Sequence, residues 1–336
     1  MWSYLTSADV LPVIFAGLMG LSILLYVILD GYDLGVGILM NRAGAVEKDM
    51  MIASIGPFWD ANETWLVLGI GLLLVAFPAA HGVILTALYL PVAAMLGGLI
   101  LRGVALDFRA KVRGEHKHIW DNVFFAGSLL AALSQGFMLG VYIVGFDWSV
   151  INASFGIICG LCLAAGYALI GACWLIMKTE DDLQRKAVGW ARIGLWLTAV
   201  GLALVSLATP FVSERVFEKW FSLPNLFLLA PIPIAAGALI IGLELLLRRM
   251  PLADDRYDWL PFLGVMGIFV LGFAGLAYSF YPYVVMDRLT IWQAASAPES
   301  LTFILVGVII VLPAILAYTA YAYRVFWGKV RELSYY

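Results

Sequence analysis

Residues 10–29, VLPVIFAGLMGLSILLYVIL, decide the fold class of this chain. The stretch carries no charged side chain, and about 20 apolar residues are enough to cross the hydrocarbon core of a bilayer as a helix. The residues before it include one charged side chain, that of Asp9. They do not show the pattern of a leader, which is a basic region, a short apolar region and a cleavage site. We therefore expect this first helix to remain in the mature protein.

The composition predicts that this helix is one of many. Hydrophobic residues make up 63% of the 336 residues, charged residues make up 13%, and the mean hydropathy is +0.96. A soluble domain does not need so apolar a composition. The sequence therefore predicts a polytopic membrane protein surrounded by lipid, with no nucleic acid among its partners.

Apolar stretches long enough to span a membrane recur along the whole chain, with short connections between them. We expect an all-α fold with nine transmembrane helices near residues 10–30, 50–77, 83–102, 122–145, 151–177, 192–212, 223–247, 260–286 and 301–323. The longest connections are Val104–Asp121 and Pro282–Ser300, and neither can hold a soluble domain. Residues 1–336 are therefore predicted to form a single membrane domain, and no internal repeat is evident.

The basic residues predict the orientation. With nine spans, one side of the membrane receives seventeen of the twenty Lys and Arg residues, and the other side receives only Arg215, Lys219 and Arg288. Cytoplasmic connections are the ones enriched in Lys and Arg. The sequence thus predicts a periplasmic N-terminus and a cytoplasmic C-terminus. The basic residues assigned to the cytoplasmic side are Arg42, Lys48, Arg102, Arg109, Lys111, Arg113, Lys117, Lys178, Arg185, Lys186, Arg192, Arg248, Arg249, Arg256, Arg324, Lys329 and Arg331.

Two acidic residues end the first apolar stretch. Asp30 and Asp33 are three residues apart, so they share one face of a helix. One interpretation is a helix that ends at the membrane surface, with both carboxylates facing headgroup water. The other is a proton entry point, because carboxylates are costly in a membrane unless they have a use.

A second acidic cluster lies inside the second apolar stretch, in Phe58-Trp-Asp-Ala-Asn-Glu-Thr-Trp65. Asp60 and Glu63 are expected at membrane depth, about ten residues or roughly 15 Å from the cytoplasmic start of the helix. Pro57 removes a backbone donor just before them and should loosen the helix. Such a polar segment must face protein or water, and it serves either proton transfer or a purely structural hydrogen-bond network.

Arg102 ends the third stretch and is followed by a charged inner cap of Asp107, Arg109 and Lys111. Arg102 either forms an ion pair with Asp60 or extends its side chain to the headgroups. Glu244 lies four residues before Arg248, and a helical ion pair explains it without a function.

The remaining ligand-type residues point away from a metal or haem site. His81 falls in an outer turn, and His116 and His118 fall in an inner loop, whereas haem in a helix bundle usually needs an axial side chain directed at the core. Cys159, Cys162 and Cys173 lie in one apolar stretch, where packing is the simpler interpretation. We expect no metal, no disulfide and no haem bound by this chain alone.

Several longer motifs resemble subunit II of the cytochrome bd quinol oxidases. They are GYDLGVG (residues 31–37), FWDANETW (58–65), RGVALDFRAK (102–111), LTIWQAASAP (289–298) and VFWGKV (325–330), and they occur in the right order from end to end. The resemblance fits the cyanide-insensitive branch as well as the ordinary branch. It implies two four-helix bundles plus a peripheral helix, in a bacterial cytoplasmic membrane.

The same resemblance implies a terminal oxidase in which subunit I is the partner. Subunit I would hold two haems b, one haem d and the quinol site, and subunit II would be haem-free. The complex would oxidise quinol near the outer face and reduce O2 to water with protons from the cytoplasm, and a small single-helix accessory subunit is a further expected partner.

The resemblance assigns a proton pathway to Asp33, Asp60 and Arg102, and we add Glu63 because it lies one turn from Asp60. As candidates for a polar network or a subunit contact we name Asp30, Trp59, Asn62 and Trp65. Two alternatives stay open. A proton-coupled secondary transporter also uses acids at membrane depth, and a scaffold would stabilise subunit I without conducting protons.

Overall fold

The computed structural model describes residues 6–112, 116–252 and 255–330, so Arg113 and Arg331 of the predicted cytoplasmic side lie outside the described residues. Within these ranges nine helical segments are long and apolar enough to span a membrane, which confirms the predicted all-α polytopic fold. The helices of these spans are α2 (Leu11–Leu39), α4 (Trp59–Ala76), α5 (Pro78–Lys111), α6 (Lys117–Ile143), α7 (Val150–Lys178), α8 (Asp181–Val212), α10 (Asn225–Leu229) continued by α11 (Pro231–Leu247), α12 (Leu260–Phe280) and α14 (Pro298–Val325).

Short elements connect these spans. A hairpin of two strands lies between α12 and α13, and it is held by antiparallel pairing of Tyr283 with Thr290 and of Val285 with Leu289. The short elements are η1 (Met40–Arg42), α3 (Ala45–Ile55), α9 (Glu214–Phe221), β1 (Tyr283–Val285), β2 (Leu289–Thr290) and α13 (Ile291–Ala294).

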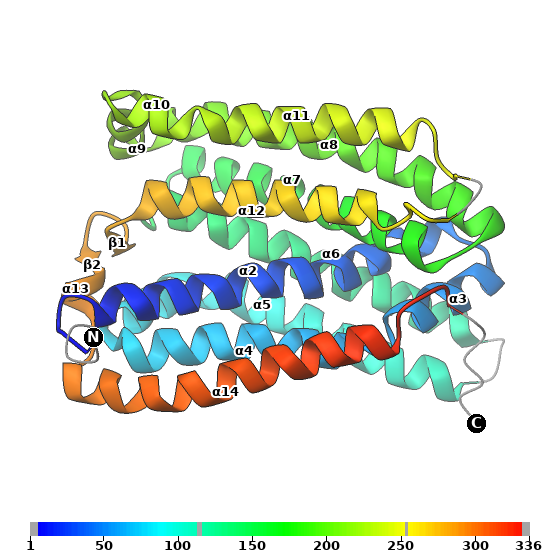
Figure 1. Cartoon of the computed structure of the whole chain (residues 1–336), viewed down its shortest axis with the longest axis horizontal. Helices are drawn as coiled ribbons and strands as arrows, with labels where there is room; N and C mark the ends of the chain where they lie inside the picture. Colours follow the sequence, from blue (N-terminus) through cyan, green and yellow to red (C-terminus); the bar gives the residue numbers. More distant parts are fainter. Residues whose placement is uncertain (1–5, 113–115, 253–254, 331–336) are drawn as a thin grey trace.

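The long helices form two groups of four. Helices α2, α4, α5 and α6 contact one another in a closed ring, and α7, α8, α11 and α12 form a second ring. Contacts of α7 with α2 and α6 join the rings. Helix α14 runs along the edge of the molecule and packs against α2 (Figure 1). This arrangement matches the two bundles and one peripheral helix that the resemblance implied.

Several predicted boundaries were wrong because charged residues do not end these helices. Helix α2 continues past Asp30 to Leu39, and α5 continues past Arg102 to Lys111, so most of the predicted inner loop Val104–Asp121 is helical. Helix α8 begins at Asp181, well before the predicted residue 192. Helix α12 ends at Phe280, before the predicted residue 286, because the chain enters the hairpin after Pro282.

The predicted second span is broken near Pro57. Helix α3 ends at Ile55, the residues 56–58 form a turn, and α4 begins at Trp59. Proline cannot donate the backbone hydrogen bond that a continuous helix needs at that position. Asp60 therefore lies in the first turn of a new helix and not in the middle of a long one.

Glycines allow the helices of the two rings to approach closely. A Cβ on Gly136 would lie 2.5 Å from the carbonyl oxygen of Cys159, and a Cβ on Gly140 would lie 2.6 Å from Cα of Gly156. Small residues at these positions therefore allow the backbones of α6 and α7 to approach closely. The approach of α2 to α7 is also close, because a Cβ on Gly35 would overlap the backbone carbonyl of Tyr167.

We expect Gly35→Ala to destabilise the chain strongly. The overlap involves backbone atoms on both helices, so relief requires the helices to separate, at a cost of about 3 kcal/mol or more. Yield in mild detergent and the midpoint of thermal unfolding measure the effect. Gly17→Ala on the same helix is the matched control, since no other atom lies within 4 Å of its added Cβ. Equal stability of the two variants would contradict the close contact.

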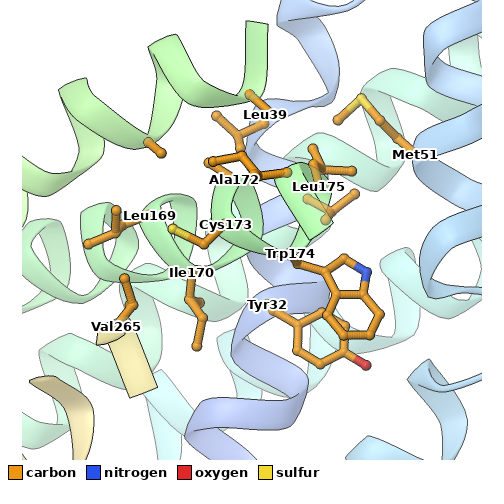
Figure 2. Close-up of a cluster of buried hydrophobic side chains, with 14 of the residues drawn as sticks. Tyr32, Leu39, Met51, Leu169, Ile170, Ala172, Cys173, Trp174, Leu175 and Val265 are labelled. Carbon is orange, nitrogen blue, oxygen red and sulfur yellow. The ribbon is translucent and has the colours of Figure 1, made fainter. Parts of the chain in front are cut away.

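A large apolar core lies at the junction of the rings. Tyr32 stacks on Trp174 with ring centroids 4.1 Å apart, and Leu39, Met51 and Val265 contribute from α2, α3 and α12 (Figure 2). Cys173 belongs to this core, and all three cysteines are free thiols. The core therefore fixes the segment of α2 that carries Asp30 and Asp33.

Candidate functional site

A buried ion cluster joins α2, α4 and α5. The Arg102 guanidinium donates through Nη1 to Asp30 Oδ1 at 2.5 Å and through Nη2 to Glu63 Oε1. The side chains of Arg102 and Asp30 have no exposed surface, whereas that of Glu63 is 29% exposed. One cation thus pairs with two carboxylates from different helices. The partly exposed Glu63 carboxylate is the member of the cluster that reaches the surface of α4.

The ion cluster depends on all of its members. Removing a charge from water costs several kcal/mol, and a well-placed partner compensates for it only while both are present. The ring of Trp59 lies 6.0 Å from the Arg102 guanidinium and covers it further. The cluster is therefore a fixed electrostatic feature between the first helices of the fold.

Asp33 lies in a different environment, although it is one turn from Asp30. Its Oδ2 accepts a hydrogen bond from Asn62 Nδ2 at 2.8 Å, and no Lys or Arg among the described residues forms an ion pair with it. The amide of Asn62 also donates to the Tyr32 hydroxyl at 2.9 Å. Asp33 thus has neutral hydrogen-bonding neighbours, as expected for a carboxyl group that exchanges a proton.

Two tyrosine hydroxyls, from α2 and α14, contact the same Asn62 amide that binds Asp33. The hydroxyls of Tyr32 and Tyr323 are 2.7 Å apart, and Tyr323 donates to Asn62 Oδ1 at 3.2 Å. The Tyr323 ring stacks on Phe58 with centroids 4.6 Å apart. The peripheral helix therefore reaches the interior of the first ring with its last turn.

A further hydrogen-bond chain ends at Asp30. The Tyr167 hydroxyl donates to Gln135 Oε1 at 2.6 Å, and Gln135 Nε2 donates to the Tyr26 hydroxyl at 2.7 Å. Tyr26 in turn interacts with the Asp30 carboxylate. All the donors are directed toward Asp30, so this chain supports its role as the acceptor for Arg102.

Both buried carboxylates keep one unpartnered oxygen. Asp30 Oδ2 and Asp33 Oδ1 make no hydrogen bond among the described residues, and the same is true of Arg102 Nε. Buried polar atoms usually have a partner, and an exception at high burial points to a functional or hydrated position. For Asp33 the free oxygen offers a place for a proton.

The structure does not bring Asp60 into the ion cluster. Both alternatives for Arg102 are wrong. Asp60 is exposed on the first turn of α4 and has no hydrogen bond or ion pair among the described residues, and the Arg102 side chain is buried and does not extend to the surface. Glu63, three residues later, occupies the position beside Arg102 instead. Asp30, Asn62 and Trp65 are buried inside the chain, so they offer no surface to a partner, and Trp59 is half-buried.

The charged inner cap is built from α3, α5 and α6. Arg109 pairs with Asp121 at 2.5 Å and with Asp49 at 2.7 Å, and Lys117 contacts Asp49 at 3.1 Å. Partial burial alone would raise the pKa of Asp49, but hydrogen bonds from Arg109 and Lys117 outweigh it and lower the pKa below its usual value. At the other ring the predicted pair of Glu244 and Arg248 is confirmed at 2.8 Å.

The sequence missed most of the hydrogen-bonding partners of the acids. Tyr26 lies four residues before Asp30, so helical spacing is a signal that places it on the same face. Gln135 and Tyr323 come from distant helices, and their sequence context is ordinary for a membrane span. Only the packing of α6 and α14 against α2 shows their role.

The three histidines lie away from the centre of the rings. His81 is in the first turn of α5, and His116 and His118 are exposed at the start of α6, at the other end of the molecule. No group of three His, Cys, Asp or Glu among the residues described could hold a metal ion. The three imidazoles therefore lie at helix ends and not inside either ring.

The chain is similar to known proteins over nearly its whole length. The model of the family described as cytochrome bd terminal oxidase subunit II matches residues 11–326. Cytochrome bd-I ubiquinol oxidase subunit 2 of Escherichia coli (strain K12) is 26% identical, over 96% of each chain. Cytochrome bd ubiquinol oxidase subunit 2 of Bacillus subtilis (strain 168) is also 26% identical, over 90% of this chain and 91% of the relative.

A solved structure shares the fold. The bd oxidase from Geobacillus thermodenitrificans contains a chain that superposes with a TM-score of 0.77 at 18% identity, covering 94% of this chain and 98% of that one. The similarity therefore extends to the arrangement of all the long helices described above.

Proposed function

Because this chain belongs to the cytochrome bd terminal oxidase subunit II family, we propose that it is the haem-free subunit of a quinol oxidase and helps to carry protons to the site of O2 reduction. Membership makes it a subunit of an oxidoreductase complex in a bacterial cytoplasmic membrane. Its partner in the proposal is subunit I, which would hold two haems b and one haem d and oxidise the quinol. The chain alone would not be catalytic.

The positions of the histidines support the haem-free assignment. An imidazole ligand needs to reach the interior of a bundle, and His81, His116 and His118 lie at the helix ends. The chemistry of electron transfer therefore belongs to the partner, and this chain contributes polar side chains inside its first ring.

The single observation that carries the proton proposal is the environment of Asp33. A fully buried carboxyl group with neutral partners and one free oxygen is suited to take up and release a proton. Reduction of one O2 to two waters consumes four protons, which need titratable groups to cross a dry bundle. In this proposal Asp33 and Asp60 carry protons, and Arg102 and Glu63 set the local electrostatics.

The proposed direction follows from the basic residues. Lys48, Arg109, Lys111 and Lys117, which the positive-inside rule assigned to the cytoplasm, belong to α3, the end of α5 and the start of α6. These segments lie at the end of the molecule opposite the N-terminus (Figure 1). Protons would therefore enter at the end formed by α3, the start of α6 and the end of α14. Family membership leaves the transporter alternative without support.

Co-purification tests the proposal. The chain is tagged in its host and purified in mild detergent, and a reduced-minus-oxidised visible spectrum is recorded beside a gel. We expect a second membrane subunit together with bands of b-type haem and of a chlorin-type haem. A colourless chain without a partner would contradict the oxidase assignment.

We expect Asp60→Asn to act only in the assembled complex. Asp60 is exposed in the first turn of α4, where its carboxylate is available to another subunit or to water. The variant chain should be as stable as the wild type, whereas O2 reduction or haem retention in the complex should fall by about tenfold. Oxygen consumption per haem and haem content measure the two effects. Normal values of both in the assembled Asp60→Asn enzyme would rule out an essential role.

A further inference from the structure

We propose that Tyr323 and Tyr32 form the proton entry to Asp33, so that the last turn of the peripheral helix α14 is part of the conducting path. This inference rests on the proposed function. It assigns a role to two hydroxyl groups and to a helix that otherwise packs against only a small part of the molecule.

The first observation is the gradient of burial along the hydroxyl chain. Tyr323 is half-buried near the end of α14, whereas Tyr32, Asn62 and Asp33 have almost no exposed surface. Asp33 therefore has no direct contact with the surroundings, and a proton must reach it through another group. Tyr323 is the member of the chain nearest the surface.

The second observation is the row of polar atoms that leads from Tyr323 to Asp33. The two hydroxyl oxygens are 2.7 Å apart, within the distance for direct proton transfer. The Tyr32 hydroxyl and Asp33 Oδ2 make no hydrogen bond with each other, but both accept from Asn62 Nδ2, at 2.9 and 2.8 Å. The proposal therefore places one water between the Tyr32 hydroxyl and Asp33 Oδ1, which has no partner among the described residues.

The third observation is that the other approach to the buried acids contains a fixed cation. A proton that entered at Glu63 would meet Arg102 before Asp30, and a guanidinium does not give up its proton in proteins. The tyrosine chain contains no fixed charge. Tyr323 donates to Asn62 Oδ1 in the structure, so transfer begins when its hydroxyl turns to donate to Tyr32, whose own proton leaves toward Asp33. Each hydroxyl accepts one proton as it gives up its own, so one proton arrives at Asp33 and both tyrosines remain neutral.

The packing around Tyr323 holds the entry in place. Its ring stacks on Phe58, and beyond it Lys178 Nζ donates to the carbonyl oxygen of Phe326 at 2.6 Å. Lys329 then binds Asp258 at 2.6 Å and the Thr179 carbonyl at 2.9 Å. The segment that follows α14 is thus bound to the end of α7, which holds the Tyr323 hydroxyl beside Tyr32.

Phenylalanine variants of the purified two-subunit oxidase test the inference. Tyr323→Phe keeps the stack on Phe58 and removes only the hydroxyl, and Tyr32→Phe keeps the stack on Trp174. We expect proton uptake after mixing the reduced enzyme with O2 to slow by about tenfold in each. Reduction of the haems by quinol without O2, which requires no proton from this path, and the haem spectrum should be unchanged. A merely structural role would lower haem content and both rates together.

Two controls separate the possible failures. Tyr321→Phe removes an exposed hydroxyl from the same helix and should have no effect. Normal proton uptake in both Tyr323→Phe and Tyr32→Phe, with slow uptake in Asp33→Asn, would overturn the tyrosine entry and leave the proposed function intact. Normal uptake in Asp33→Asn as well would overturn both.

Discussion

Arg102→Gln is expected to destabilise the chain by about 3–5 kcal/mol, because it leaves Asp30 buried without its cation. The guanidinium is the ion-pair partner of both Asp30 and Glu63, and none of its surface is exposed. Glutamine can donate hydrogen bonds but carries no charge. The amount of chain recovered in mild detergent and the midpoint of thermal unfolding measure the loss.

A second variant distinguishes the ion cluster from simple packing. Combining Arg102→Gln with Asp30→Asn removes the uncompensated charge, so it should recover a large part of the lost stability. Arg102→Lys should fall between, since one ammonium group cannot donate to both carboxylates with the planar geometry of a guanidinium. Equal stability of Arg102→Gln and wild type would contradict the ion cluster as described.

Asp33→Asn is expected to lower O2 reduction by the assembled oxidase by about 100-fold. The substitution keeps the size of the side chain and an oxygen that can accept from Asn62 Nδ2, but it removes the exchangeable carboxyl proton. The variant should assemble with normal haem content. Oxygen consumption per haem, with quinol in excess, measures the effect.

Asp49→Asn is the matched control for this change. Asp49 is a carboxylate of the same size, but it forms ion pairs with Arg109 and Lys117, and its side chain is half exposed and lies outside the buried chain. Exposed ion pairs contribute little, so activity should change by less than about twofold. Equal activity of Asp33→Asn and Asp49→Asn would support the scaffold alternative.

Hydropathy correctly predicted the nine spans found among the described residues, because lipid imposes a length and a composition on each helix. It failed at helix ends, where Asp30 and Arg102 were taken to mark the membrane surface. The two charges neutralise each other inside the bundle, so the helices continue past them. Pairing between distant residues is not visible in hydropathy.

The sequence predicted which residues form the site better than it predicted which of them bind one another. Asp30, Asp33, Asn62, Glu63 and Arg102 do come together, since the motifs that carry them lie on the neighbouring helices α2, α4 and α5. Glu63, and not Asp60, lies beside Arg102. This depends on where α4 begins after Pro57, because the first residue of the helix sets which of its side chains face α5. The rotation of the helix follows from packing and not from the order of residues alone.

The most direct test of a proton-carrying role for Asp33 is proton uptake by the Asp33→Asn oxidase during a single turnover, followed with a pH indicator after reduced enzyme is mixed with O2. We expect uptake to slow by about 100-fold, in step with O2 reduction, while haem content and haem reduction by quinol stay at wild-type levels. Uptake at the wild-type rate in that variant would contradict a proton-carrying role for this subunit.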